Sequence, residues 1–231
     1  MPLQNLCGYM EEAAAIHAAK LGFSVEELAK RRLAWAITSN WIEFHNLPYL
    51  GGDVLNQEDA SWVQVKTWPV SVERLRYRRD FLITWRGAVL AKAVTDWVVI
   101  NLETRRVERI PEFICRLQPE QPEFVMDVGR LRLKSRVNTI ERNSFVVRKA
   151  DIDRNNHVNN ARFTEWIVES VPDEVSSKRQ IKGLHILYLA EGKYGDDVIA
   201  QSSSESEDRL LHSLCRKSDG LELVRARSIW I

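Results

Sequence analysis

The chain of 231 residues contains the same succession of segments twice. A helix-forming stretch at residues 6–23, "LCGYMEEAAAIHAAKLGF", precedes four stretches that are rich in β-branched and aromatic residues. Residues 161–171, "ARFTEWIVESV", again have a helical pattern, and four more strand-like stretches follow them. One helix followed by four strands, found twice, indicates an internal repeat of about a hundred residues.

Local signals set the expected limits of these elements. In the first helix apolar residues recur at steps of three and four, and Gly22 is placed to end it. Ser24 is a suitable N-cap for a second, short helix at residues 24–32, with Glu27 as its capping-box partner. The pair "RG" at residues 86 and 87 favours a hairpin turn. Strands are expected at residues 34–44, 61–70, 73–85 and 88–101, and at residues 144–152, 181–191, 196–206, 209–218 and 221–231.

These patterns predict an α+β protein made of two tandem hotdog domains, each an antiparallel β-sheet wrapped around a central helix. The first domain is expected at residues 1–132, including a polar, proline-containing connector, and the second at residues 133–231. The first copy begins almost directly in its helix, so its first strand is expected to be missing, which would leave one sheet edge unpaired. A natural start and an N-terminal truncation both stay open.

Composition excludes several classes of protein. The formal net charge of +1 gives no global reason to expect binding to nucleic acid or to an anionic membrane. Three widely separated cysteines suit a reducing compartment better than a disulfide framework, and no zinc-site pattern is present. The first residues contain neither a secretory signal nor a membrane-spanning stretch. We therefore expect a cytoplasmic protein without membrane insertion, metal or cofactor.

A polar run, "DIDRNNHVNN" at residues 151–160, separates an expected strand from an expected helix. We call it the polar loop. If residues 9–12 correspond to residues 166–169, the offset is 157 and the partner of His157 falls at position zero, so the first copy has no such loop. Asp and Asn are common turn formers, and Asn159 or Asn160 can simply cap the helix. Any chemistry done by this loop is done once per chain.

The stretch "DIDRNNHVNNARFTEWIVESVP" resembles the motif of the fatty acyl-acyl carrier protein thioesterases, Asp-x-Asn-x-His-Val-Asn-Asn followed by a helix with an aromatic-x-x-Trp-Ile pattern. The segments "EEAAAIHAAKLGFS", "RRDFLITW", "VINLETRRVERIPEF" and "YLAEGKYGDDVIAQS" are also similar to parts of that family. The resemblance covers nearly the whole chain. It implies hydrolysis of the thioester between a fatty acyl group and the phosphopantetheine arm of acyl carrier protein.

The resemblance also implies the catalytic positions, which match Asp153, Asn155 and His157 in the polar loop and Glu191 in "YLAEGKYG". We expect Glu191 with His157 to activate water and Asp153 to orient His157, while Asn155 or a backbone N–H at the start of the following helix steadies the thioester oxygen. Direct attack by a carboxylate stays open, as does a purely structural role for the loop residues or Glu191.

One departure from the family concerns position 192, which holds glycine where many members have a cysteine after the matching glutamate. That difference closes a Cys-His-Asn route in this chain. Packing roles are expected for the thiols of Cys7, Cys115 and Cys215. The stretch "GGDVLNQEDASW" at residues 51–62 is longer than the family's turn at that place.

Other functions and partners stay open beside this one. The alternatives are a thioesterase acting on coenzyme A esters and a non-catalytic hotdog protein that binds acyl thioesters. The chain is expected to be a monomer or a homodimer. The remaining histidines are expected to be structural or exposed: His17, His45, His185 and His212. An arginine cluster is expected either to be a solvated face or to dock an acidic carrier protein: Arg31, Arg32, Arg74, Arg76 and Arg78.

Overall fold

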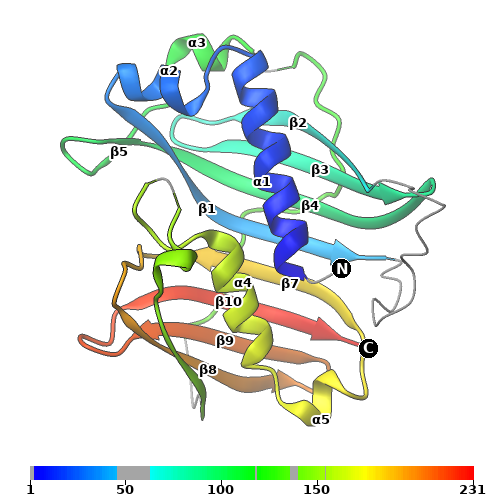
Figure 1. Ribbon diagram of the computed structural model, residues 1–231. Helices are drawn as coiled ribbons and strands as arrows, with labels where there is room; N and C mark the ends of the chain where they lie inside the picture. Colours follow the sequence, from blue (N-terminus) through cyan, green and yellow to red (C-terminus); the bar gives the residue numbers. More distant parts are fainter. Residues whose placement is uncertain (1–2, 46–62, 118, 136–139, 154) are drawn as a thin grey trace, which may run out of the picture. The chain divides into compact units, whose positions relative to one another are not determined.

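A computed structural model describes residues 3–45, 63–117, 119–135, 140–153 and 155–231. The chain divides into two compact units. The N-terminal unit is Gly8–Gly129, and the C-terminal unit combines the residues up to Cys7 with Arg130–Ile231. Each unit has an antiparallel sheet with one helix lying across it (Figure 1), so the predicted α+β hotdog architecture is confirmed. The predicted long turn at residues 51–62 lies outside the described residues.

The sheet of the N-terminal unit has the strand order β2-β3-β4-β1, and a short strand, β5, pairs with β4. Helix α1 (Leu3–Lys20) lies across this sheet, as Figure 1 shows. The other elements of the unit are α2 (Val25–Lys30), β1 (Leu33–Phe44), β2 (Gln64–Val72), β3 (Tyr77–Trp85), β4 (Ala88–Asn101), β5 (Val107–Glu108) and α3 (Glu112–Cys115).

The predicted helix end, helix N-cap and hairpin turn of this unit are confirmed. Gly22, just after α1, has a positive φ of 82°, a conformation that glycine adopts without strain. The Ser24 side chain accepts from the backbone N–H of Glu27 and caps α2. Arg86 and Gly87 both have positive φ, as the tight turn between β3 and β4 requires.

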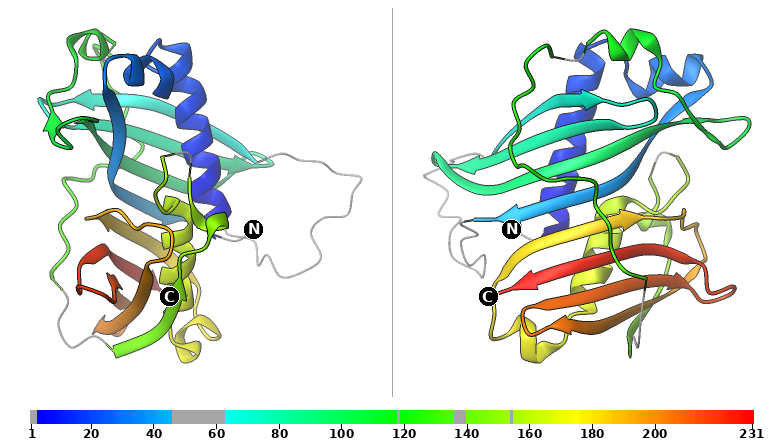
Figure 2. Two further views of the ribbon diagram at one scale, coloured as in Figure 1. Left: turned by 60° about the vertical axis from the view of Figure 1, so that its left-hand side comes forward. Right: turned by 180° about the vertical axis from the view of Figure 1, so that it is seen from behind.

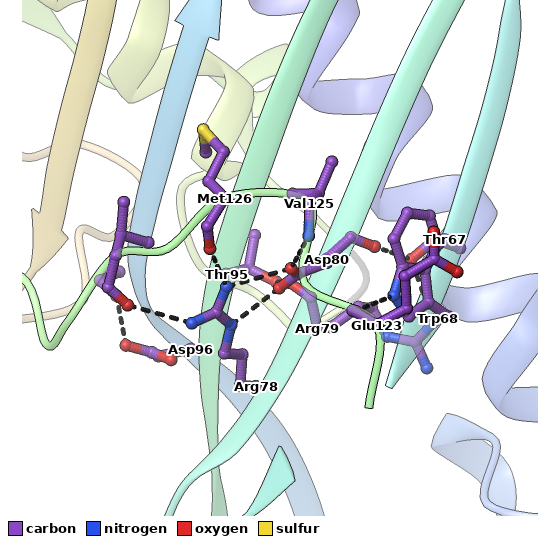
Figure 3. A network of polar contacts seen from close by, with 12 residues as sticks. Thr67, Trp68, Arg78, Arg79, Asp80, Thr95, Asp96, Glu123, Val125 and Met126 are labelled. Carbon is purple, nitrogen blue, oxygen red and sulfur yellow. Dashed lines mark hydrogen bonds and ion pairs between the residues drawn. The ribbon is translucent and has the colours of Figure 1, made fainter. Parts of the chain in front are cut away.

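The connector, whose described part within this unit is residues 119–129, crosses the face of this sheet opposite α1, as the view from behind in Figure 2 shows. Arg78 and Asp80 on β3 form a buried ion pair with two hydrogen bonds, of 2.8 and 3.0 Å. The connector completes it: the carbonyls of Met126 and Val128 accept from Arg78, and the N–H of Val125 donates to Asp80 (Figure 3). The prediction that Arg78 can dock a carrier protein is therefore wrong, because its side chain is buried under the connector.

The sheet of the C-terminal unit has the strand order β7-β10-β9-β8-β6. Helix α4 (Asn160–Glu169) lies across it and packs on β9. The other elements of the unit are β6 (Ile140–Val146), the 3₁₀ turn η1 (Lys149–Asp151), α5 (Asp173–Ser176), β7 (Ile181–Tyr188), β8 (Asp197–Ser206), β9 (Arg209–Arg216) and β10 (Glu222–Trp230).

The strand before α4 differs from its predicted range of residues 144–152. It begins earlier and ends at Val146. Residues 149–151 form the 3₁₀ turn instead, because the Asp151 carboxylate accepts from the backbone N–H of Arg148 at 2.8 Å and folds the chain back on itself. The strand therefore stops several residues before the polar loop.

Helix α4 buries the face that its sequence predicts, with Phe163, Trp166 and Ile167 in the core. Ser170, the C-cap of this helix, places its hydroxyl 2.9 Å from the Nδ1 atom of His212 on β9. None of the three cysteines, all of which lie in the described ranges, forms a disulfide: two are buried, in α1 and β9, and Cys115 is half-buried at the end of α3.

Candidate active site

The polar loop is a small hairpin between η1 and α4. Its stem is held by backbone hydrogen bonds from the Asn159 N–H to the Asp151 carbonyl and from the Asp153 N–H to the His157 carbonyl, both 2.8 Å long. A β-bridge joins Ile152 and Val158 between them. These contacts fix the two arms of the loop side by side, so Asp153 lies opposite His157.

The turn of the hairpin is organised by the Asp153 carboxylate. It accepts from the backbone N–H groups of Asn155, at 2.8 Å, and His157, at 3.1 Å, and more weakly from the Asn155 side chain at 3.4 Å. Asn156 has a positive φ of 61°, which asparagine tolerates better than most residues. Asp153 therefore holds His157 through its backbone, whereas the sequence had not indicated which part of His157 it would contact.

The imidazole of His157 pairs with Glu191 from a segment that follows β7. The His157 Nε2 atom lies 3.0 Å from a Glu191 carboxylate oxygen, and the two side chains are 23% and 40% exposed. The backbone holds the two segments together, since the Val158 N–H donates to the Gly192 carbonyl at 2.9 Å. The structure thus brings together the four residues selected from the sequence, and leaves the His–Glu pair open to solvent on one side.

Gly192 faces Val158 so closely that it has no room for a side chain. A Cβ atom built on Gly192 would lie 2.8 Å from Val158 Cγ2. A cysteine at this position would have to displace the valine that follows His157. The glycine is therefore part of the local packing. The three thiols of the chain contact residues outside this group: Cys7 contacts Thr164, Cys115 contacts the Ile110 carbonyl and Cys215 contacts Ser213.

The start of α4 adds backbone donors beside the loop. The Asn159 side chain accepts from the Ala161 N–H at 2.8 Å, which confirms the predicted N-cap. The N–H of Asn160 has no acceptor among the described residues. Because the first N–H groups of a helix point out of its positive end, this end favours a developing negative charge.

Sequence reasoning missed one acidic residue of the polar loop. Asp151 is 1% exposed, and its carboxylate is held by Arg148 and lies near Arg162 of α4. The only sequence signal was an arginine three residues before the aspartate, a spacing that also occurs in many surface pairs.

Within the described ranges, no three His, Cys, Asp or Glu side chains are arranged to hold a metal ion. No helix in those ranges is long and apolar enough to cross a membrane.

Family models match nearly the whole chain. The acyl-ACP thioesterase N-terminal domain matches residues 1–117, and the acyl-ACP thioesterase C-terminal domain matches residues 134–231.

Curated relatives match over 99% of the chain. An oleoyl-acyl carrier protein thioesterase of Arabidopsis thaliana is 25% identical, and an acyl-[acyl-carrier-protein] hydrolase of Cuphea viscosissima is 27% identical. Both of these relatives are named as chloroplastic. The chain spans 70% of the length of the first and 57% of the second.

Solved structures share the fold. An acyl-ACP thioesterase from Bacteroides thetaiotaomicron superposes with a TM-score of 0.84 and is 23% identical, and the match covers 100% of this chain and 90% of that one. A 12:0-ACP thioesterase from Umbellularia californica gives 0.82 and 22% identity with the same coverage. At these identities the likeness establishes the fold.

Proposed function

Since the chain belongs to the acyl-ACP thioesterase family, a family of thioester hydrolases, we propose that it releases fatty acids from acyl carrier protein. In this proposal Glu191 and His157 activate the water that attacks the thioester. The observation that carries the proposal is the 3.0 Å contact between His157 Nε2 and the Glu191 carboxylate. It pairs a carboxylate with an imidazole at a solvent-accessible edge of the polar loop, where water can reach both.

The proposed reaction begins with removal of a proton from water. His157 donates its Nε2–H to one Glu191 oxygen and so orients the carboxylate, and the carboxylate accepts the proton of the attacking water. The water oxygen forms a bond to the thioester carbonyl carbon, and negative charge develops on the carbonyl oxygen. Collapse of this intermediate breaks the C–S bond, and the proton passes to the leaving sulfur. The products are a fatty acid and the free phosphopantetheine thiol.

Backbone and amide donors are proposed to stabilise the developing oxyanion. The Asn160 N–H is suited to this role because it has no acceptor among the described residues and lies at the positive end of α4. The Asn155 side chain is the second candidate, because its contact with Asp153 is long, at 3.4 Å. Asp153 itself acts on the loop backbone, so its proposed role is to hold His157 and Asn155 in place.

Direct attack by Glu191 on the thioester is the alternative first step. It would form an acyl-enzyme anhydride that water then hydrolyses. Turnover in ¹⁸O-labelled water, followed by mass analysis of the peptide that contains Glu191, tests it. Incorporation of ¹⁸O into Glu191 supports the anhydride. Water activation is supported if, in a single turnover, ¹⁸O is found only in the fatty acid and no anhydride can be trapped.

Three finer assignments are part of the proposal. The C-terminal domain, residues 133–231, carries the catalytic loop, and the N-terminal domain, residues 1–132, has either a structural or a substrate-shaping role. The protein acts in the cytoplasm. It is a monomer or a homodimer, since two hotdog domains in one chain already provide the pair that single-domain hotdog proteins form by dimerising.

The carrier is tested with matched substrates. Hydrolysis is measured on acyl carrier protein esters and coenzyme A esters of graded chain length, with the wild type beside His157→Ala. Faster hydrolysis of the carrier protein esters, lost in His157→Ala, supports the proposal. Preference for coenzyme A esters supports the alternative acyl-CoA thioesterase. Binding of acyl thioesters without hydrolysis of either supports a non-catalytic binder.

A further inference from the structure

A buried carboxylate outside the proposed catalytic set lies at the base of the polar loop. Asp151 is 1% exposed, although it is the first residue of the polar loop. A side chain so deeply buried cannot touch a substrate. Its burial nevertheless carries a desolvation cost, so its partners must compensate for it.

The partners of Asp151 lie on both sides of the loop. Before the loop, Arg148 donates Nε to Oδ2 and Nη2 to Oδ1, both at 3.0 Å, and its backbone N–H also donates to Oδ2. After the loop, Arg162 in α4 places its Nε 3.4 Å from Oδ1. The Asp151 carbonyl also accepts from the N–H of Asn159. One residue therefore joins the segment that enters the loop to the helix that leaves it.

The charge on Asp151 is favoured by these contacts. Burial alone would oppose ionisation, but the hydrogen bonds from Arg148 and the positive charges of Arg148 and Arg162 outweigh it and lower the pKa of Asp151. The carboxylate is therefore ionised at neutral pH and bridges two guanidinium groups. Such charge-assisted, two-point contacts restrict orientation more than a single neutral hydrogen bond does.

We propose that Asp151 is a positioning residue for the thioesterase reaction, whose carboxylate fixes the base of the polar loop so that His157 meets Glu191. The inference rests on the proposed function. Asp153 maintains the shape of the turn from within, whereas Asp151 sets where the hairpin stands relative to η1 and α4. Loosening the base moves His157 as part of a rigid hairpin, and a displacement of about 1 Å in a reacting group can lower the rate about 100-fold.

The test compares Asp151→Asn with a matched ion pair elsewhere in the same unit. Arg227 donates to both oxygens of Glu205, at 2.6 and 2.7 Å, between β10 and β8. Glu205→Gln therefore removes an equivalent carboxylate charge that has no contact with the loop. For acyl-ACP hydrolysis we expect Asp151→Asn to lower kcat by about 10-fold or more with KM within about 2-fold. Glu205→Gln should leave both constants unchanged.

A second variant keeps the proposal testable if Asp151→Asn does not fold. Arg162 is 36% exposed, so Arg162→Gln is expected to fold and still to lower kcat several-fold. In folded proteins, the double variant should be no slower than Asp151→Asn alone, because both changes remove the same bridge. The ¹⁵N shifts of the His157 imidazole should also change in Asp151→Asn. Additive losses, or imidazole shifts identical to those of the wild type, would overturn the proposal.

Glu191→Gln, measured alongside, separates failure of this inference from failure of the proposed function. If Glu191→Gln is inactive while Asp151→Asn retains the wild-type kcat, only the positioning role is overturned. An equal loss of kcat in Asp151→Asn and Glu205→Gln likewise overturns it. If Glu191→Gln is fully active, the proposed catalytic pair is wrong, and with it the positioning role that depends on it.

Discussion

Acid is expected to destabilise the C-terminal unit by protonating His212, a residue with no proposed part in catalysis. His212 is 1% exposed, and burial lowers its pKa from 6.5 to about 3. Its neighbours fix a neutral tautomer. Ser170 donates its hydroxyl to the Ile167 carbonyl and so accepts from His212 Nδ1, whereas Ser228 accepts from Trp230 and so donates to Nε2. A proton on Nε2 would displace the Ser228 hydroxyl hydrogen from its acceptor.

The size of the effect follows from the two pKa values. The folded state keeps His212 neutral, whereas the unfolded chain takes up a proton below pH 6.5, so this contribution to stability is complete above that pH and is lost as the pH falls toward about 3. Each pH unit in this window costs about 1.4 kcal/mol, which gives a loss of about 2 kcal/mol at about pH 5. Burial also lowers the pKa of His185, to about 4, and adds a loss of similar sign.

Urea unfolding of the wild type and His212→Gln, measured from about pH 7.5 to about pH 5, tests this account. Glutamine supplies a donor and an acceptor but does not titrate in this range. The difference in free energy of unfolding between the two proteins should shrink by about 2 kcal/mol as the pH falls. Both proteins contain His185, so its contribution cancels in the difference between their free energies of unfolding. An unchanged difference across the range would refute the reasoning.

Three other perturbations have defined outcomes. Gly192→Ala should lower kcat and destabilise the protein by about 1–3 kcal/mol through its clash with Val158, and Val158→Ala should recover much of the loss in stability, as thermal unfolding would show; a fully tolerated Gly192→Ala contradicts the packing argument. Asp80→Asn should cost about 3–5 kcal/mol in urea unfolding by leaving Arg78 buried without its charge partner, whereas Arg78→Met with Asp80→Leu should cost much less; an equal cost would show that the ion pair itself stabilises the fold. The Nδ1 atom of His17 lies 3.0 Å from the buried guanidinium of Arg79, and burial together with the charges of Arg79 and Lys20 lowers the pKa of His17. The free energy of unfolding should therefore decrease as the pH falls below 6.5, because the unfolded chain then binds a proton that the folded state does not. His17→Gln should remove this component from the pH dependence of unfolding.

The repeat, the hairpin at residues 86 and 87 and the buried face of α4 could be predicted because each is encoded locally. Helical and strand periods, a turn dipeptide and an N-cap need only a few neighbouring residues. The same is true of the polar loop, whose side chains bind its own backbone. The contact between His157 and Glu191 was reached only through the family resemblance, because it depends on how two segments 34 positions apart are held together.

The misassigned residues have a common physical cause. Arg78 stands in the charged string "ERLRYRRDF", which is typical of a solvated face, and its burial depends on a connector almost fifty residues further along the chain. The strand before α4 ended early because Arg148 and Asp151 form a compact turn that β-propensity does not reveal. In both cases an ion pair that involves a buried carboxylate overrode the local pattern.

The central claim is that Glu191 and His157 act as one unit on the thioester. Single-turnover hydrolysis of an acyl carrier protein ester by Glu191→Gln, His157→Ala and the double variant tests it most directly. We predict that each single variant lowers the rate by about 100-fold or more, and that the double variant is little slower than either. Wild-type rates in either single variant, or losses that multiply in the double variant, would contradict the claim.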